Sequence, residues 1–368
     1  MPNVLGLVSF RIYPTLMGGQ KGVALFYQYL SQHLNVWLAA SSDNEASEEV
    51  QLEGILFPNK KIYFNVSRMK QLKQMVTGKN IDVIIAEHSY TGWMAWWLHR
   101  KTGKPFIIHS HNIESKRFRQ MNKWWWKIYH RYEGWIHRKA NHNFFISSDD
   151  MQFAIKEFRL DKNNCSVVTY GIEKTSFREN KHALKTRLGI DGDETILLFN
   201  GTLDYEPNYD AVVKLVDVLD PLLCEKMKNY KIVITGNRAP GSLLRKMSSS
   251  KSVRYAGYVN DVNDYYQCAD LFLNPVVNDT GVKTKLIEAM ANHCTSISTQ
   301  SGANGLMKEL CGDKLVIVAD HDWNRFAQEI VKWHHADKTE TPREFFEHYD
   351  CNNIVTKCSE TIKEVSRQ

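Results

Sequence analysis

A short segment at 280–291, TGVKTKLIEAMA, carries residue types that suit a diphosphate and a ribose. Lys283 and Lys285 stand just before, or at the start of, a predicted helix, whose first amides and positive dipole end also attract anions. Glu288 follows one turn later, where a carboxylate can accept hydrogen bonds from two vicinal hydroxyls. Two lysines in a first turn oppose the helix dipole, so a binding site explains them better than an ordinary solvated turn.

Glycines and small polar residues follow several predicted strands. Gly18 and Gly19 lie between the first strand and the first helix. There the backbone can approach a phosphate closely, although a tight strand-to-helix turn explains the pair equally well. Gly201 and Thr202 end a later strand within NGTLDYEPN, and Asn237 ends the next strand within ITGN. Each of these signals is weak by itself.

Two histidines follow another predicted strand, in the segment HSHNIESKRF at 109–118. A histidine at the carboxyl end of a strand can point into a cleft and hydrogen-bond a sugar hydroxyl. We assign that role to His111, which lies in the loop. His109 is predicted to be a packed histidine.

The segment at 116–139 is strongly basic and aromatic. Its eight cations and one acid, Glu133, give a charge of 8 − 1 = +7, so the rest of the chain sums to −1. Such a mixture suits the interface of an anionic membrane. It suits equally a helix whose tryptophans pack on a core beneath solvated cations. A nucleic-acid partner has no other support in the chain. The residues are Lys116, Arg117, Arg119, Lys123, Lys127, Arg131, Arg138 and Lys139, interleaved with Trp124, Trp125, Trp126, Tyr129 and Trp135.

Short apolar runs alternate with longer amphipathic stretches, which is typical of parallel sheets with helices on both faces. The first series has expected strands at 4–10, 36–41, 82–88, 105–112, 141–148 and 166–171, and helices at 18–34, 93–102 and 149–158. The second has expected strands at 195–201, 231–237, 252–259, 270–276 and 295–299, and helices at 209–219, 261–269 and 284–293. The stretch at 172–194 is interpreted as a linker, and 343–368 as helix. The fold class is therefore α/β, with two doubly wound Rossmann-like domains facing each other across a cleft.

The bulk composition excludes several classes of protein. A chain of 368 residues is long enough for two domains, and a net charge of +6 is only mildly basic. Seven cysteines without a C-x-x-C pair argue against a disulfide framework or a zinc site and favour a reducing cytoplasm. The N-terminal residues are interpreted as a buried strand and not as a signal peptide. No apolar run reaches 18 residues, so any association with the inner face of the membrane is expected to be peripheral.

In combination, these motifs resemble the retaining GT-B glycosyltransferases of family four, the "glycosyl transferases group 1" type. The resemblance covers nearly the whole chain. It implies transfer of a sugar, with retained configuration, from a UDP- or GDP-linked donor to a glycan or lipid-linked acceptor, usually in bacterial surface polysaccharide or glycolipid synthesis. The motifs are Gly18-Gly19, SHNIES at 110–115, NGTLDYEPNYDAV at 200–212, ITGN at 234–237, AGYVNDVNDYYQCADLFLNP at 256–275 and GVKTKLIEAMA at 281–291.

The resemblance also implies roles for residues and domains. The loop at Gly18-Gly19 lies near the donor diphosphate, His111 contacts the donor sugar, and Glu288 holds the ribose. Lys283 and Lys285 match basic positions that face the diphosphate. The acceptor-side domain is expected at 1–171, the nucleotide-sugar domain at 172–345, and a C-terminal helix that packs back on the first domain at 346–368. The other donor-binding residues are expected to be Gly201, Thr202, Asn237, Thr280, Gly281, Val282 and Thr284.

The chain departs from the family pattern at two places. Thr280 stands eight positions before Glu288, where many members have a glutamate that contacts the donor sugar. NGTLDYEPN lacks the usual Arg and Lys pair, so we infer that Lys283 and Lys285 supply its charge. With no carboxylate placed as a nucleophile and no D-x-D motif, we expect a front-face reaction without a metal or other cofactor. A nucleotide-sugar epimerase and a non-catalytic binding or scaffolding protein remain as alternatives.

Overall fold

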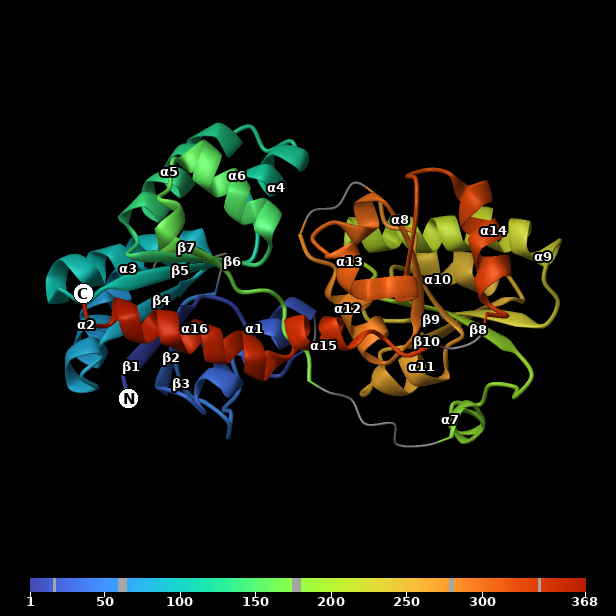
Figure 1. Cartoon of the computed structure of the whole chain (residues 1–368), viewed down its shortest axis with the longest axis horizontal. Coiled ribbons are helices and arrows are strands. Elements are labelled where there is room, and N and C mark those ends of the chain that lie inside the picture. The colour runs from blue at the N-terminus through green and yellow to red at the C-terminus, as the bar shows by residue number, and fades with distance from the viewer. Residues whose placement is uncertain (16–17, 59–64, 174–179, 278–280, 337–338) are drawn as a thin grey trace. The chain divides into compact units, whose positions relative to one another are not determined.

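The computed structural model describes residues 1–15, 18–58, 65–173, 180–277, 281–336 and 339–368. The chain divides into two compact units, each built on its own parallel sheet (Figure 1). Unit 1 comprises Met1–Gly171 together with Tyr349–Gln368, and unit 2 comprises Ile172–His348. The second unit therefore ends at His348, whereas the sequence places its end at 345.

The sheet of unit 1 has the strand order β3-β2-β1-β4-β5-β6-β7. Successive residues of β1 enter two different cores, Val4 and Val8 on one face and Leu5 and Leu7 on the other, as the two-residue period of a strand requires. Burial on both faces is why these strands are continuously apolar in the sequence. The strands are β1 (Asn3–Val8), β2 (Asn35–Ser41), β3 (Gln51–Leu56), β4 (Val83–Glu87), β5 (Phe106–Ser110), β6 (His142–Phe145) and β7 (Cys165–Val167).

Helices cover both faces of this sheet. The predicted acidic start of one helix is confirmed, because Ser147 caps α6 by accepting from the amide of Asp150 at 3.2 Å, with Asp149 also in the first turn. The C-terminal helix α16 lies beside α1, and its Val355 and Ile362 enter the core that contains Val23 of α1. The helices are α1 (Gly18–Leu30), α2 (Met69–Gly78), α3 (Ser89–Thr102), α4 (Glu114–Gln120), α5 (Trp126–Lys139), α6 (Ser148–Phe158) and α16 (Cys351–Val365).

The sheet of unit 2 has the order β10-β9-β8-β11-β12-β13. Numbered within its own unit, each sheet follows the Rossmann order 3-2-1-4-5-6, with a seventh strand added in unit 1. The prediction of two doubly wound α/β domains is therefore confirmed. The switch points, where the loops of such sheets bind ligands, fall between β1 and β4 and between β8 and β11. The strands are β8 (Thr195–Asn200), β9 (Tyr230–Thr235), β10 (Val253–Gly257), β11 (Leu271–Asn274), β12 (Thr295–Thr299) and β13 (Leu315–Val318).

Two helices expected from the sequence differ in the structure, one within unit 2 and one that runs from unit 2 into unit 1. The expected helix at 209–219 is α8 followed by a π-helical turn at Leu215–Leu219 and then α9, where Pro221 opens the new segment. The expected helix at 343–368 is two helices, because Asp350 caps α16 separately. The helices are α7 (Lys181–Arg187), α8 (Glu206–Lys214), α9 (Asp220–Cys224), α10 (Gly241–Ser248), α11 (Asn263–Cys268), α12 (Thr284–Ala291), α13 (Lys308–Cys311), α14 (Trp323–Trp333) and α15 (Arg343–Tyr349).

The prediction of a linker over 172–194 is wrong for its described second half. Helix α7 lies within it and packs on α11. Leu184 is 1% exposed, and the ammonium of Lys185 donates to the carbonyls of Gly192 and Glu194 at 2.9 and 2.5 Å. The polar composition misled the interpretation, because Lys185 is a buried cation that satisfies backbone carbonyls.

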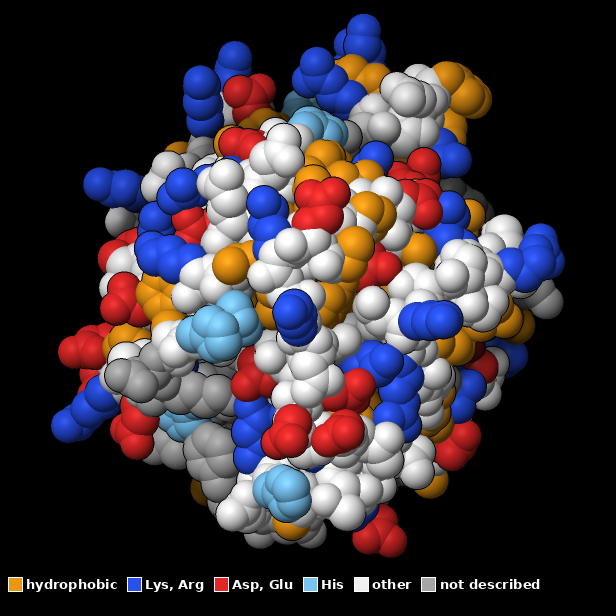
Figure 2. Space-filling model, turned by 90° about the vertical axis from the view of Figure 1, so that its right-hand side faces the viewer, with side chains coloured by type: hydrophobic (Ala, Val, Ile, Leu, Met, Phe, Trp, Pro, Cys, Tyr) orange, Lys and Arg blue, Asp and Glu red, His pale blue; other side chains and the backbone are white. Residues whose placement is uncertain are grey.

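One face of the molecule carries mixed charge. On the face that Figure 2 shows, basic and acidic side chains stand next to one another, with apolar side chains scattered among them. A face of this kind lacks the continuous basic patch of a nucleic-acid interface. Within the described residues, no helix is long and apolar enough to cross a membrane.

Candidate functional site

The loop that leads into α12 carries the predicted diphosphate residues. Lys283 is the N-terminal cap residue of α12 and is only 5% exposed. Its ammonium donates to the carbonyl of Gly281 at 2.7 Å, and Gly281 has a φ of +79° that favours glycine. Val282 lies in the same loop and Thr284 begins the helix. Thr280 lies outside the described residues. The positive side chain thus sits at the positive end of the helix dipole, an arrangement that suits an anion.

The second lysine joins this helix to the loop after β8. Lys285 donates to the amide oxygen of Asn208 at 2.8 Å, and its ammonium lies 4.5 Å from the centre of the Phe199 ring. Asn208 in turn donates to the carbonyl of Thr202 at 3.0 Å. Helix α12 is therefore tied to α8, and through Asn208 to the loop after β8, at the switch point of unit 2. Sequence reasoning missed Asn208, whose only signal is its place beside Pro207 in the EPN segment of the motif.

Glu288 lies one turn into α12 and is 8% exposed. Burial and the nearby Glu288 carboxylate hold the pKa of Tyr266 well above its usual range. The Tyr266 hydroxyl also accepts from the amide of Asn200, the last residue of β8, at 3.2 Å. The structure thus places Glu288 beside the carboxyl end of β8, where Gly201 and Thr202 follow.

The glycines after β8 and β9 allow two strand ends to approach closely. A Cβ atom on Gly236 would lie 1.8 Å from the carbonyl oxygen of Gly201, and Gly236 has a φ of +147°. A Cβ atom on Gly201 would lie 2.7 Å from the side-chain nitrogen of Asn208. Beside them, the side-chain oxygen of Asn237 is buried and has no hydrogen-bond partner among the described residues. A buried acceptor without a partner is costly to a fold and is typical of a group that meets a ligand.

In unit 1, Gly18 and Gly19 form the first two residues of α1. A Cβ atom on Gly19 would meet nothing within 4 Å, so packing within the described structure does not demand glycine there. Gly22, one turn further, does require it, because a Cβ atom would lie 2.8 Å from the ring of Tyr170. The first turn of α1 contains no acidic residue that would repel an anion.

A buried carboxylate at the end of β4 holds both histidines of the next strand and loop. Glu87 and His109 are partners in the pairing of β4 with β5. One oxygen of Glu87 accepts from the Tyr27 hydroxyl at 2.7 Å and from Nδ1 of His109 at 3.1 Å. The other oxygen lies 2.5 Å from Nε2 of His111. His109, which is 3% exposed, is the packed histidine that the sequence predicts.

The charges of this cluster follow from burial and proximity. Burial alone would raise the pKa of Glu87, but the charge and hydrogen bonds of His109 and His111 outweigh it, so the pKa lies well below its usual range. Burial lowers the pKa of His111 to about 4, and the positive charge of His109 adds to that effect. At neutral pH the cluster therefore contains an ionised Glu87 and an uncharged His111.

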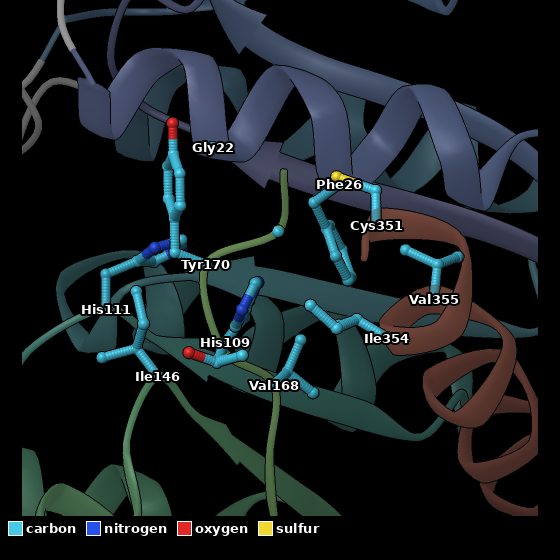
Figure 3. Close-up of a pocket in the computed structure, with 12 residues that line it drawn as sticks. Gly22, Phe26, His109, His111, Ile146, Val168, Tyr170, Cys351, Ile354 and Val355 are labelled. Carbon is cyan, nitrogen blue, oxygen red and sulfur yellow. The ribbon is translucent and has the colours of Figure 1, made fainter. Parts of the chain in front are cut away.

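A narrow pocket adjoins the cluster and lies within unit 1 (Figure 3). Its cavity volume of about 20 Å³ leaves room for about one water-sized group. In Figure 3, Gly22 and Phe26 come from α1, Ile354 and Val355 come from α16, and His111 lies on the side away from α16. An imidazole at the wall of a mostly apolar pocket is a natural contact for one polar group of a ligand.

Glu87, His109 and His111 also form a cluster whose ligand atoms lie within 4.8 Å of one another, which is close enough for a metal ion. Here the same atoms are joined by hydrogen bonds, and these account for both carboxylate oxygens. The absence of a catalytic metal stays a prediction. Sequence reasoning missed Glu87, although its signal was present as a single acid ending the apolar run DVIIAEH.

The basic aromatic segment forms α4, α5 and the turn between them. Trp135 packs on the sheet core of unit 1 and meets Trp96 edge to face, with ring centres 5.1 Å apart. Trp124 is instead 84% exposed, and Met121 and Ile128 are 55% and 63% exposed. Glu133, the one acid of the segment, is buried. Each interpretation from the sequence therefore fits a different part of the segment. The C-terminal half of α5 packs on the core, whereas the turn before α5 and the start of α5 present apolar side chains to solvent.

The comparisons with known families agree with this architecture. A sequence model for "Glycosyltransferase Family 4" matches residues 18–175, and one for "Glycosyl transferases group 1" matches residues 194–335. The chain belongs to the family 4, group 1 glycosyltransferases and has their GT-B architecture. The predicted family is confirmed.

Individual relatives are distant in sequence. The chain is 24% identical over 282 residues to an uncharacterized 44.6 kDa protein in the cps region of Klebsiella pneumoniae, covering 73% of this chain and 69% of that protein. It is 22% identical over 274 residues to UDP-Gal:alpha-D-GlcNAc-diphosphoundecaprenol alpha-1,3-galactosyltransferase of Escherichia coli, covering 70% of each chain. The structure of Anabaena Alr3699/HepE in complex with UDP shares the fold with a TM-score of 0.75 and 12% identity, covering 99% of this chain and 100% of that one.

Proposed function

We propose that this glycosyltransferase moves a hexose from a UDP- or GDP-linked donor to a glycan or lipid-linked acceptor, with retained configuration, in surface polysaccharide or glycolipid synthesis. The observation that carries the proposal is the placement of Lys283 and Lys285 at the N-terminus of α12, with Glu288 one turn further. Two cations and the positive end of the helix dipole stabilise the charge of a leaving diphosphate. The E. coli relative is named for a UDP-sugar and a diphosphoundecaprenol-linked acceptor, which favours UDP and a lipid carrier.

The proposed reaction uses these groups for positioning and for electrostatic stabilisation. The bond between the anomeric carbon and the diphosphate oxygen breaks, and a bond from that carbon to the acceptor oxygen forms on the same face. The proton of the acceptor hydroxyl passes to the departing diphosphate. Lys283, Lys285 and the amides of α12 stabilise the charge that develops on the diphosphate, and Glu288 holds the ribose. His111 contacts the donor sugar, the backbone at Gly18 and Gly19 lies near the diphosphate, and the reaction needs no metal.

A nucleotide screen tests the proposal and separates it from its alternatives. The purified protein is heated with UDP, GDP, ADP, CMP and dTDP and with their common sugar conjugates. A ligand at a hundred times its dissociation constant adds about 2.7 kcal/mol of stability, which is easily measured. The sugar product is then analysed by NMR with and without a lipid-linked acceptor. Transfer with an unchanged anomeric configuration supports the proposal. An epimer formed without acceptor indicates an epimerase, and the lack of any nucleotide effect indicates a non-catalytic protein.

The turn between α4 and α5 is the part of the chain that we propose meets an anionic membrane surface, where a lipid-linked acceptor resides. The turn exposes Met121, Trp124 and the cation Lys123, and the start of α5 directly after it exposes Ile128 and the cation Lys127. Aromatic and apolar groups enter the headgroup region while lysines meet anionic lipids, each cation near the surface contributing about 1 kcal/mol.

Liposome co-sedimentation tests this contact. Binding should rise with the anionic lipid content of phosphatidylcholine and phosphatidylglycerol vesicles, and Trp124→Ser should weaken it. Tyr258→Ser is the matched control, because Tyr258 is a 53% exposed aromatic residue of unit 2. Binding that does not depend on the anionic lipid content, or that both substitutions weaken equally, would contradict the membrane contact.

A further inference from the structure

We propose that Glu87 is a positioning residue for His111, which it holds in a single ring orientation and tautomer so that Nδ1 presents a lone pair to a hydroxyl of the sugar donor. The inference rests on the proposed function, because it needs a donor sugar at His111. To that function it adds a role for Glu87, which sets the orientation of the imidazole toward the sugar and determines which group donates the hydrogen bond between them.

The carboxylate of Glu87 is held in place by other residues than His111. Glu87 is fully buried at the end of β4, and the Tyr27 hydroxyl and Nδ1 of His109 hold one of its oxygens at 2.7 and 3.1 Å. The carboxylate and these two partners come from three different elements, since Glu87 lies in β4, Tyr27 in α1 and His109 in β5. The other oxygen is therefore presented to Nε2 of His111, at 2.5 Å, in a direction that the fold determines.

The direction of the hydrogen bond follows from the charge of the carboxylate. An ionised carboxylate can only accept hydrogen bonds. The pKa of Glu87 lies well below its usual range because His109 and His111 outweigh the effect of burial, so the group is ionised at neutral pH. Nε2 of His111 must then carry the proton that is shared with Glu87. Because burial lowers the pKa of His111 to about 4, its other nitrogen, Nδ1, is unprotonated.

Neighbouring rings hold the imidazole in place. The ring of His111 has its centre 4.3 Å from that of His109 and 4.7 Å from that of His88. His88 is itself held by stacking on Tyr90, with ring centres 4.8 Å apart and planes 13° from parallel. A ring held on two sides and bonded at one nitrogen has little freedom to rotate, so Nδ1 keeps one orientation.

The unprotonated nitrogen belongs to the residue that lines the pocket. His111 contributes to the pocket wall, and no hydrogen bond to its Nδ1 occurs among the described residues (Figure 3). A cavity of about 20 Å³ admits about one hydroxyl-sized group there. A sugar hydroxyl can donate to Nδ1, whereas a hydrogen-bond acceptor at the same place would be repelled. The geometry thus distinguishes a sugar bearing a free hydroxyl at this position from one that lacks it.

The direct test is ¹⁵N NMR of the full chain labelled at the histidine imidazoles, at pH 7.5 and with a chelator present so that no bound metal fixes the ring. The signals of His111 are assigned by their loss in His111→Gln. We expect Nε2 in the protonated range and Nδ1 in the unprotonated range. The opposite tautomer, a fast mixture of the two, or a doubly protonated ring would overturn the proposal. The tautomer is measured in the wild-type chain, and the variant serves only to assign the signals.

The functional test is Glu87→Gln, whose amide has one accepting oxygen and one donating NH2 group and therefore cannot accept from all three partners. Donor kcat/KM, measured with whichever of UDP-glucose and UDP-galactose the wild type uses, should fall about tenfold, as expected for one neutral hydrogen bond, while the Kd for UDP stays within about twofold. Glu133→Gln is the matched control, because Glu133 is a buried glutamate of the same unit outside the pocket lining. It should change neither value. Equal losses in the two variants, or a weaker Kd for UDP in Glu87→Gln alone, would make Glu87 merely structural.

The outcomes separate this inference from the proposed function. If the wild type turns over no nucleotide sugar but the His111 signals show the expected tautomer, the proposed function and the contact with a donor sugar fail, and only the fixing of the His111 tautomer by Glu87 stands. If donor turnover is normal but the tautomer is reversed, the proposed function stands and the positioning role fails.

Discussion

The two units use the same strand order and place different chemistry at the same topological position. In unit 1 the residue that ends the strand beside β1 is Glu87, a buried carboxylate that binds two imidazoles. In unit 2 the loops beside β8 and β11 offer bare backbone at Gly201 and the ammonium groups of Lys283 and Lys285. The Rossmann order decides where loops converge. The side chains at the strand ends decide whether that place suits an uncharged hydroxyl or a diphosphate.

This comparison predicts that the ends of β8 and β9 need glycine to keep their structure, and not only to let a ligand approach the backbone. Gly236→Ala should lower the free energy of unfolding of unit 2 by about 4 kcal/mol, because it combines a backbone strained for alanine with an overpacked contact. The Cβ atom would lie 1.8 Å from the carbonyl oxygen of Gly201 at a φ of +147°. Hydrogen exchange measured by mass spectrometry should show faster exchange in peptides from 195–235.

Gly241→Ala serves as the control. At this first residue of α10, a Cβ atom would meet only the side chain of Arg245, at 3.7 Å, which is an ordinary contact. Its exchange pattern should match the wild type, and peptides of unit 1 should be unchanged in both variants. Slow, wild-type exchange in Gly236→Ala would show that the strand ends can move apart and that the close approach is not a structural requirement.

The sequence predicted the parts of this molecule that depend on local pattern. Continuous apolar runs revealed buried parallel strands, and the lysines of α12 were found because they oppose a helix dipole. It missed β3 and β13, the first of which lies at the edge of its sheet with half of its residues exposed. It also missed the partners Glu87 and Asn208, because their roles depend on contacts with residues 22 and 77 positions away. The spacing of residues along the chain shows which of them share one face of a helix or strand. It contains no information about contacts between distant segments.

Glu133 extends the comparison within unit 1. It is buried like Glu87, but its pKa is shifted in the opposite direction. Burial raises the pKa of Glu133 from its ordinary value of 4.5 to about 7, against the opposing hydrogen bonds from Ser115 and Glu114. Between these two values the folded state keeps a proton that the unfolded state releases, so the free energy of unfolding falls as the pH rises from about 4.5 to about 7 and then levels off. The total change is at most about 3 kcal/mol.

Urea unfolding of the wild type and of Glu133→Gln at a series of pH values measures this effect. The free energy of unfolding of the wild type minus that of the variant gives the contribution of Glu133 at each pH, since glutamine does not titrate. The difference should be most favourable to the wild type near pH 4.5 and should decline toward pH 7. A difference that rises with pH would mean that the amides of Glu114 and Ser115, which donate at 2.9 and 3.0 Å, keep the carboxylate ionised in the folded chain.

The finest test of the comparison asks which part of the donor each unit recognises. Lys283→Ala should weaken UDP and the UDP-sugar alike, by about 10- to 100-fold, because a charge-assisted contact to a phosphate contributes about 1.5–3 kcal/mol. His111→Ala should leave the Kd for UDP unchanged and lower donor kcat/KM about fivefold to tenfold, because it removes one neutral hydrogen bond to the sugar. Isothermal titration and initial rates measure both quantities. If His111→Ala weakened UDP itself as strongly as Lys283→Ala does, the imidazole would serve the diphosphate, and the proposed assignment of His111 to the donor sugar would fail.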